Sequence, residues 1–175
     1  DIINVENLIS TMPINILAKS LEPQPPNEIL TFLESIKFRT IKLCILYLSI
    51  DQFTENASIY FPDIGCPFNR IYEPKNRSAE MAPDGKTSIV IEIPMGKNNI
   101  NIDIEDDQLF EDVVFYLQSK KLLKKETIIK YKMVKIPFAY PLILKDRDIN
   151  LKKTISYFST FSNMDIVGRN ATFEY

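Results

Sequence analysis

The segment that most constrains the fold is the apolar run FRTIKLCILYLSI at residues 38–50. Read as a strand, it alternates between two apolar faces, one with Leu43, Ile45 and Tyr47 and the other with Cys44, Leu46 and Leu48. A strand that is apolar on both faces needs cover on both sides, as a strand in the middle of a sheet has. The run therefore predicts a central β-strand.

Shorter strand patterns separated by turn residues predict further strands at 57–62, 68–74, 87–94 and 127–137. Apolar residues at helical spacing predict helices near 27–36, 106–119 and 149–160. A short strand is expected at 8–11 and a terminal strand within 164–175. Strands grouped in this way predict an α+β fold, with a largely antiparallel sheet and helices packed on it.

Length and composition limit the remaining possibilities. A chain of 175 residues with 45% hydrophobic content suits a single domain over 1–175. Its 21 basic and 23 acidic residues are scattered, which argues against a nucleic-acid partner. No apolar run approaches the roughly 20 residues of a membrane-spanning helix, and the first residues do not resemble a signal peptide. We expect a cytoplasmic protein in which Cys44 and Cys66 are reduced.

Two residue types are scarce enough to exclude whole classes of chemistry. The chain has no histidine, which removes Ser-His-Asp and Cys-His catalysis and histidine-based zinc sites. Its four glycines, at 65, 85, 96 and 168, cannot form G-x-G-x-x-G or a P-loop. The chain therefore has no glycine-rich turn of its own for a dinucleotide pyrophosphate. The composition suggests neither a catalytic residue nor a metal ligand.

Arg70, Glu73 and Glu92 are the charged residues that antiparallel pairing of 68–74 with 87–94 would bring together. An arginine in a sheet could clamp a phosphate or carboxylate. The pattern fits a cross-strand ion pair better. In either case we expect Arg70 and Glu73 to have partners, because unpaired polar groups inside a strand are costly.

The following loop, KNRSAEMAPDGKTS, carries Lys75, Arg77 and Lys86. A basic loop could bind an anionic substrate. The alternative is a solvated connection, and it is favoured because Pro83-Asp84-Gly85 is a turn signal that requires no function.

The segment PFNRIYEPKNRSAEMAPDGKTSIVIEIP, residues 67–94, also resembles a family pattern. The pattern consists of three motifs in order: N-R-I-x-E-x-K-N-x-S, M-A-P-x-G-K-T and E-I-P. The segment is similar to this pattern in FAD-dependent oxidoreductases of the flavin-containing amine oxidase and protoporphyrinogen oxidase superfamily. UDP-galactopyranose mutases carry a looser version. VENLISTMPI, FAYP and IVGRNATFEY agree with the family in order along the chain.

The resemblance implies a substrate-binding domain, truncated at both ends from a larger FAD-binding protein. It implies FAD in the full-length protein and none in this fragment, which alone would be inactive. The expected partners are a small-molecule substrate and the missing FAD-binding domain of the same polypeptide. Two alternatives remain open. One is the substrate domain of a UDP-galactopyranose mutase-like isomerase, and the other is a self-contained, non-enzymatic module that binds an anionic ligand or a protein.

Matching positions carry the family's site residues onto this chain. The substrate-binding residues implied by the resemblance are Arg70, Tyr140, Asn69 and Glu73, and those near the cofactor are Gly168 and Arg169. The chain departs from the pattern at residues 77–80 and at Met95, where a cysteine commonly follows E-I-P. These departures leave the substrate, and the choice between oxidation and isomerisation, open.

Overall fold

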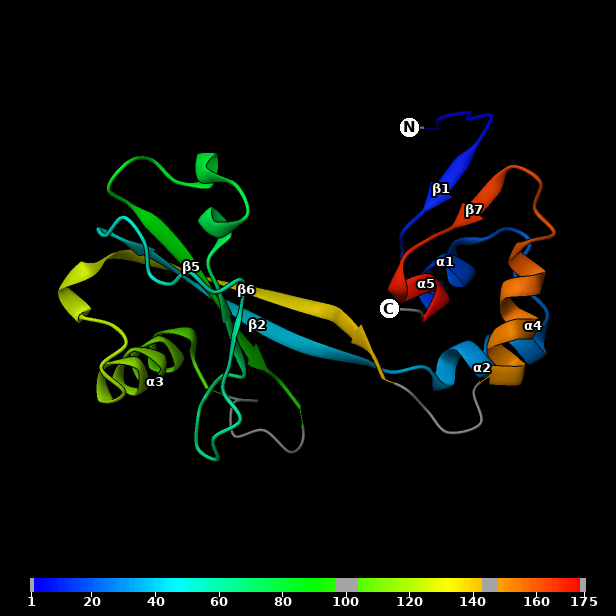
Figure 1. Cartoon of the computed structure of the whole chain (residues 1–175). Coiled ribbons are helices and arrows are strands. Elements are labelled where there is room, and N and C mark those ends of the chain that lie inside the picture. Colours follow the sequence, from blue (N-terminus) through cyan, green and yellow to red (C-terminus); the bar gives the residue numbers. More distant parts are fainter. Residues whose placement is uncertain (1, 97–103, 143–147, 174–175) are drawn as a thin grey trace. The chain divides into compact units, whose positions relative to one another are not determined.

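The structure is a computed structural model that describes residues 2–96, 104–142 and 148–173 (Figure 1). The chain divides into two compact units. We call residues 40–137 the central unit and residues 1–39 with 138–175 the terminal unit. Each unit is described by itself.

The central unit is built on a five-stranded sheet in the order β3-β4-β5-β2-β6. The strands are β2 (Phe38–Leu48), β3 (Ile59–Tyr60), β4 (Arg70–Tyr72), β5 (Thr87–Pro94) and β6 (Ile128–Pro141). Residues 38–39 of β2 and 138–141 of β6 are counted with the terminal unit. The pairs β2–β5, β3–β4 and β4–β5 are antiparallel. The predicted α+β class and antiparallel sheet are confirmed, and β2 lies between two neighbours as its apolar pattern predicts.

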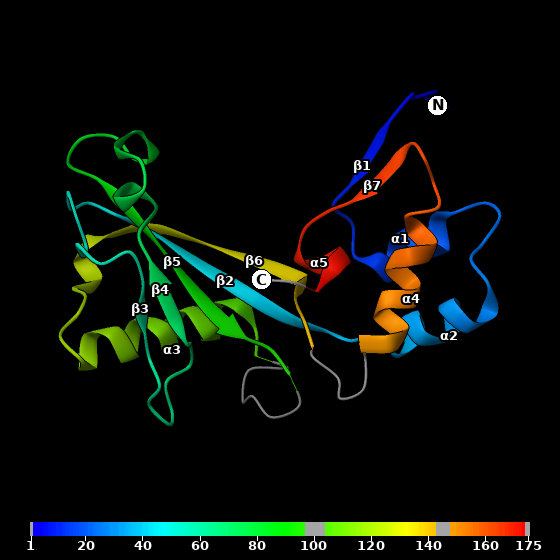
Figure 2. The same cartoon turned by 45° about the vertical axis from the view of Figure 1, so that its right-hand side comes forward.

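Helix α3 (Asp106–Ser119) lies along one face of this sheet (Figure 2). Leu109, Val113 and Leu117 recur every fourth residue and are buried. They form one core with the inward side chains of β2, β4 and β5, which are Cys44, Leu46, Leu48, Ile71, Ile89, Ile91 and Ile93. Asp106 and Asp107 occupy its first turn, where carboxylates complement the helix dipole. The helix therefore has the bounds that its sequence predicts.

Three short 3-10 helices mark the turns of the central unit: η1 (Pro74–Asn76), η2 (Ala79–Met81) and η3 (Lys125–Thr127). Gly85 has a φ of 68°, in the left-handed region that favours glycine. This conformation fits the turn that Pro83-Asp84-Gly85 predicts just before β5.

The terminal unit contains the α-helices of the described residues other than α3. Its elements are β1 (Leu8–Ser10), α1 (Ile14–Ser20), α2 (Asn27–Ser35), α4 (Asp148–Phe158), β7 (Met164–Ile166) and α5 (Arg169–Thr172). Strands β1 and β7 form a two-stranded parallel sheet. The core is a separate cluster that includes Ile14, Leu17, Leu33, Phe158 and Met164.

Two expectations are corrected here. The predicted helices near 27–36 and 149–160 do not contribute to the core that α3 shares with the sheet, because α2 and α4 bury their apolar residues in the separate core of the terminal unit. The predicted strand within 164–175 ends at Ile166. Gly168, with a φ of 85°, turns the chain, and its carbonyl accepts hydrogen bonds from the backbone N–H groups of Ala171 and Thr172. Helix α5 follows; residues 174–175 lie outside the described part.

Within the described ranges, no helix has the length and apolar character needed to cross a membrane. Among the same residues, His, Cys, Asp and Glu side chains form no group of three or more suited to a metal ion. Cys44 and Cys66 are both free thiols, as expected.

Candidate functional site

The face of the central sheet opposite α3 carries a cluster of charged and aromatic side chains. Ile71 of β4 points into the core, so its neighbours Arg70 and Tyr72 lie on the other face. Arg70 stands directly opposite Glu92 of β5, and its Nη2 forms an ion pair with Glu92 Oε1. The side chains are 25% and 8% exposed. The cross-strand ion pair favoured by the sequence is therefore confirmed.

Aromatic rings surround this arginine. The guanidinium carbon of Arg70 lies 5.4 Å from the ring centroid of Tyr72 and 5.9 Å from that of Tyr60. Arg77 adds a second guanidinium, with its carbon 5.3 Å from the Tyr72 centroid. Burial and the nearby Glu92 carboxylate raise the pKa of Tyr72, against the opposing effect of the two arginines. Tyr72 is thus a neutral phenol whose ring faces two cations, a favourable cation–π geometry.

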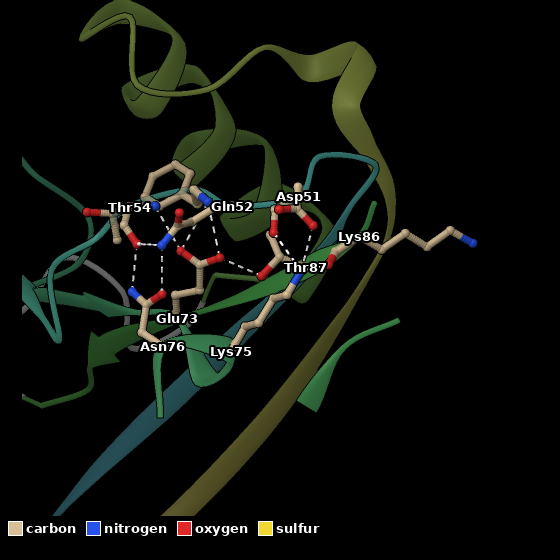
Figure 3. A network of polar contacts seen from close by, with 9 residues as sticks. Asp51, Gln52, Thr54, Glu73, Lys75, Asn76, Lys86 and Thr87 are labelled. Atoms are coloured by element: carbon tan, nitrogen blue, oxygen red, sulfur yellow. Dashed lines mark hydrogen bonds and ion pairs between the residues drawn. The ribbon is translucent and has the colours of Figure 1, made fainter. Parts of the chain in front are cut away.

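Glu73 has a different role from Arg70, although the two are close in the sequence. Its side chain is fully buried. Its carboxylate accepts hydrogen bonds from the backbone N–H groups of Phe53 and Thr54, at 3.0 and 2.8 Å, and from the Thr87 hydroxyl at 2.6 Å (Figure 3). The expectation that Arg70 and Glu73 both have partners is confirmed. Glu73 holds a loop, whereas Arg70 pairs across the sheet.

Lys75 and Asn76 extend this polar network to neighbouring loops (Figure 3). Lys75 Nζ donates to Asp51 Oδ1 at 2.8 Å and to the Asp51 and Lys86 carbonyls at 3.0 and 3.3 Å. This hydrogen bond and charge lower the pKa of Asp51. Asn76 Nδ2 donates to the carbonyls of Thr54, at 2.6 Å, and Asn56, at 3.1 Å. The E-x-K-N part of the sequence motif therefore fixes the loops beside β4.

Asn69 contributes to the sheet through its backbone. Its N–H donates to the Glu92 carbonyl at 3.0 Å, and its carbonyl accepts from the Phe61 N–H at 3.0 Å. Asn69 itself is exposed. Its predicted role in substrate binding stays a prediction.

The other predicted site residues belong to the terminal unit. Arg169 Nη2 donates to the Ala139 carbonyl at 2.8 Å, and the guanidinium carbon lies 4.5 Å from the Tyr140 ring centroid. Asn170 Nδ2 donates to the Phe138 carbonyl at 2.9 Å. Arg169 and Tyr140 are thus brought together from distant parts of the chain, next to Gly168. The assignment of these residues to substrate and cofactor stays a prediction.

Tyr60 was missed by the sequence analysis. Its signal was weak, because β3 has two residues and gives little alternation to read. The register of the β3–β4 pair places Tyr60 directly opposite Arg70, so a correct hairpin alignment would have found it. Asn76 was also missed as a loop anchor, since an asparagine after a proline turn reads only as a turn residue.

The described residues do not supply a phosphate site for a dinucleotide. Gly65, Gly85 and Gly168 have positive φ values, but they lie in separate turns. The helix that follows Gly168 is α5, with four residues. A flavin pyrophosphate needs clustered backbone N–H groups at a glycine turn and a helix N-terminus.

The fold itself is one known from larger proteins. No family model and no curated protein matches the sequence. The structure of reduced UDP-galactopyranose mutase aligns with a TM-score of 0.78 and 19% identity, over 100% of this chain and 38% of that chain. A candidate protoporphyrinogen oxidase from Exiguobacterium sp. 255-15 aligns with a TM-score of 0.64 and 12% identity, over 94% of this chain and 36% of that chain. A protein from Pyrococcus furiosus aligns with a TM-score of 0.58 and 15% identity, over 94% of this chain and 34% of that chain.

The chain therefore has the fold of one part of these proteins and spans less than two fifths of their length. The mutase and the protoporphyrinogen oxidase both belong to the flavin amine oxidase superfamily. The resemblance that the sequence motifs indicate is thus matched by the fold. At these identities the likeness establishes the fold alone.

Proposed function

We propose that the chain is the substrate-binding part of an FAD-dependent oxidoreductase of the amine oxidase or protoporphyrinogen oxidase type. The observation that carries the proposal is the alignment of the whole chain with 38% of a mutase of the same superfamily. The resemblance of residues 67–94 to the family pattern also supports it. In the structure these residues hold β4 and the adjoining loops in one arrangement.

In this proposal Arg70 contacts substrate from the face of the sheet opposite α3. The ion pair with Glu92 and the ring of Tyr72 restrict its guanidinium, which reduces the entropy lost when a ligand binds. Asn69 directly precedes Arg70, at the start of β4, and Glu73 supports the site through its hydrogen bonds to the loop at residues 53–54. Tyr140 is assigned to substrate, and Gly168 with Arg169 to the cofactor. When bound, the flavin would supply the redox chemistry.

A mutase-like isomerase is the second candidate, because the mutase gives the higher TM-score of the two named enzymes, 0.78 against 0.64. The two functions differ in their balance of electrons. An oxidoreductase leaves the flavin reduced or oxidised after one half-reaction, whereas an isomerase returns it unchanged because product and substrate have the same composition.

The test uses the protein encoded by the longest reading frame that contains this sequence. Its visible absorption spectrum should be that of bound flavin. Loss of the oxidised-flavin bands on adding an amine or a porphyrinogen would support the oxidoreductase. Conversion of UDP-galactopyranose to an isomer by the reduced protein, with no net change in the spectrum, would support the mutase.

A protein without flavin would contradict both functions and favour the self-contained binding module. The 175-residue chain alone is the control, and we expect no saturable FAD binding when it is titrated and flavin fluorescence is followed. Tight binding by this control would show that the cofactor site has been misplaced.

A further inference from the structure

The first residues of the terminal unit leave a run of apolar side chains exposed. Ile9 is 69% exposed although it lies within strand β1. A single exposed apolar residue is ordinary, whereas a contiguous group marks a surface that another part of a protein covers. The aliphatic side chains of residues 2–9 are all exposed, and they are Ile2, Ile3, Val5, Leu8 and Ile9.

Strand β1 also has a free hydrogen-bonding edge. The Leu8 N–H donates to the Asn163 carbonyl at 2.8 Å. The Ser10 carbonyl accepts from the Val167 N–H at 2.9 Å, so residues 8 and 10 both face β7. Backbone groups of successive strand residues point to opposite edges, and those of Ile9 therefore point away from β7. Among the described residues this sheet has two strands, so none of them forms a third strand along that edge (Figure 1).

The edge strands of the five-stranded sheet are different, because both are protected against further pairing. Strand β3 has two residues. Strand β6 carries the exposed residues Lys130, Lys132 and Lys135. Very short edge strands and lysines on an edge are ways in which natural sheets prevent pairing with another strand. The segment NLISTM at residues 7–12, which contains β1, has no charged residue. The edge of β1 is therefore open to pairing.

We propose that β1 is an interior strand of a larger sheet. A strand from the part of the longer polypeptide outside residues 1–175 pairs with its free edge, and a helix of that part covers Ile9. The proposal rests on the proposed function, in that it takes the chain to be one part of a larger flavoprotein. The alignment of the whole chain with 38% of the mutase supports a polypeptide long enough to supply both elements.

The parallel pairing of β1 with β7 favours this occupant over a second copy of the chain. Parallel strands occur almost only in sheets whose two faces are both covered, usually by helices. One face of this pair meets the core of the terminal unit through Met164. The other face carries Ile9 opposite Asp165, and both are exposed. Pairing two β1 edges from two copies would satisfy the backbone of Ile9, but it would bring no helix over its side chain.

Hydrogen exchange at the Ile9 amide tests the added strand. The experiment compares the 175-residue chain with the protein encoded by the longest reading frame that contains it. The Leu8 amide, which is bonded to β7, is the internal reference. In the 175-residue chain we expect the Ile9 amide to exchange fast. In the longer protein it should exchange about a hundredfold more slowly, because its N–H then donates to the neighbouring strand.

Substitution tests the cover over the side chain. Ile9→Lys in the longer protein should lower the melting temperature by at least about 5 °C, because the lysine ammonium would be buried without a partner. In the 175-residue chain the same change should shift it by less than about 2 °C. Ile129→Lys is the matched control, since Ile129 is an exposed isoleucine of the edge strand β6. It should shift the melting temperature of either protein by less than about 2 °C.

Equally fast exchange at Ile9 in both proteins would overturn the proposal, and so would equal shifts from Ile9→Lys and Ile129→Lys in the longer protein. Protection of Ile9 that grows with the concentration of the 175-residue chain would also overturn it, because the occupant would then be a second copy. The flavin spectrum is a separate measurement. Flavin with an unprotected Ile9 would refute this interface and leave the proposed function intact, whereas a protected Ile9 without flavin would do the reverse.

Discussion

The central and terminal units reach a buried core by different routes. The central unit is one continuous stretch, and its strands β3, β4 and β5 follow one another in the sheet as they do in the sequence. The terminal unit joins two ends of the chain: Leu8 of β1 pairs with Met164 of β7. Closing a contact over so long a loop costs more conformational entropy than closing one over a short loop.

The units also differ in what they bury besides apolar side chains. In the central unit, Glu73, Thr87 and Glu92 are buried together with hydrogen-bond or ion-pair partners. Among the described residues of the terminal unit, the buried polar residues are Ser10 and Thr154, and the Thr154 hydroxyl donates to the Asn150 carbonyl of its own helix. Buried charge is costly unless paired. The comparison shows that the motif-bearing unit contains the more demanding polar arrangement.

The largest expected effects separate the two cores. Leu46→Ala in the central unit should lower the free energy of unfolding by about 2–5 kcal/mol, and Phe158→Ala in the terminal unit by about 3–5 kcal/mol, because each leaves a cavity at a fully buried site. Hydrogen exchange should show that each variant opens its own unit first. Equal loss of protection in both units from either variant would indicate one cooperative fold.

A smaller effect tests the polar arrangement of the central unit. Glu73→Ala removes the acceptor for the Phe53 and Thr54 N–H groups, and we expect a loss of about 2 kcal/mol. Urea denaturation measures this loss, and amide exchange at 53 and 54 localises it. Glu80→Ala, at an exposed position of η2, is the control and should change stability by less than about 0.5 kcal/mol. A similar loss in both variants would refute the role given to Glu73.

Thiol reactivity distinguishes the core of the central unit from its surface turns. Burial raises the pKa of Cys44 to about 12, and burial also raises the pKa of the half-buried Cys66. At pH 8 we expect Cys66 to react slowly with a disulfide reagent in the native chain, and Cys44 only after unfolding. Cys66→Ser should abolish the native reaction. Rapid modification of Cys44 in the native state would show that this core is open to solvent.

The smallest effects come from one exposed ion pair in each unit. Lys75 lowers the pKa of Asp51 below its usual 3.8, and Lys153 lowers that of Glu28 below 4.5, in each case mainly through a hydrogen bond. A carboxyl with a depressed folded pKa adds stability at neutral pH, which is lost as the pH falls through the folded pKa. Carboxyl titration by NMR should place both midpoints below the usual values. Asp51→Asn and Glu28→Gln should each remove the part of the acid-dependent loss of stability that comes from that carboxyl. A carboxyl whose titration midpoint is unshifted would show that its ion pair with lysine does not form.

Much of the central unit could be predicted from its sequence. The apolar alternation of β2 and β5 and the four-residue spacing in α3 are local signals, and each segment folds where its pattern places it. Of the candidate site, the Arg70–Glu92 pair followed from antiparallel pairing of adjacent strands. The role of Glu73 as a loop anchor could not be predicted from the sequence. Its partners include backbone N–H groups of Phe53 and Thr54, and a backbone group gives no residue-specific signal.

The terminal unit was less predictable. Apolar residues of α2 and α4 show only that each helix has a face to bury, and the pattern does not say whether that face meets a sheet or another helix. Residues 164–175 were apolar enough to suggest a strand, yet the positive φ of Gly168 redirects the chain into α5. A single glycine allows such a turn without requiring it.

The sequence by itself determined where the strands and helices of the central unit lie, the exclusion of histidine chemistry and the resemblance to flavoenzymes, since all three depend on residue identity and local spacing. Only the tertiary structure decided that there are two cores, that Tyr60 and Arg77 join Arg70 at Tyr72, and that Glu73 faces inward. These features depend on strand register and on how a turn is anchored. Both are fixed by contacts between residues distant in the sequence, which no local pattern encodes.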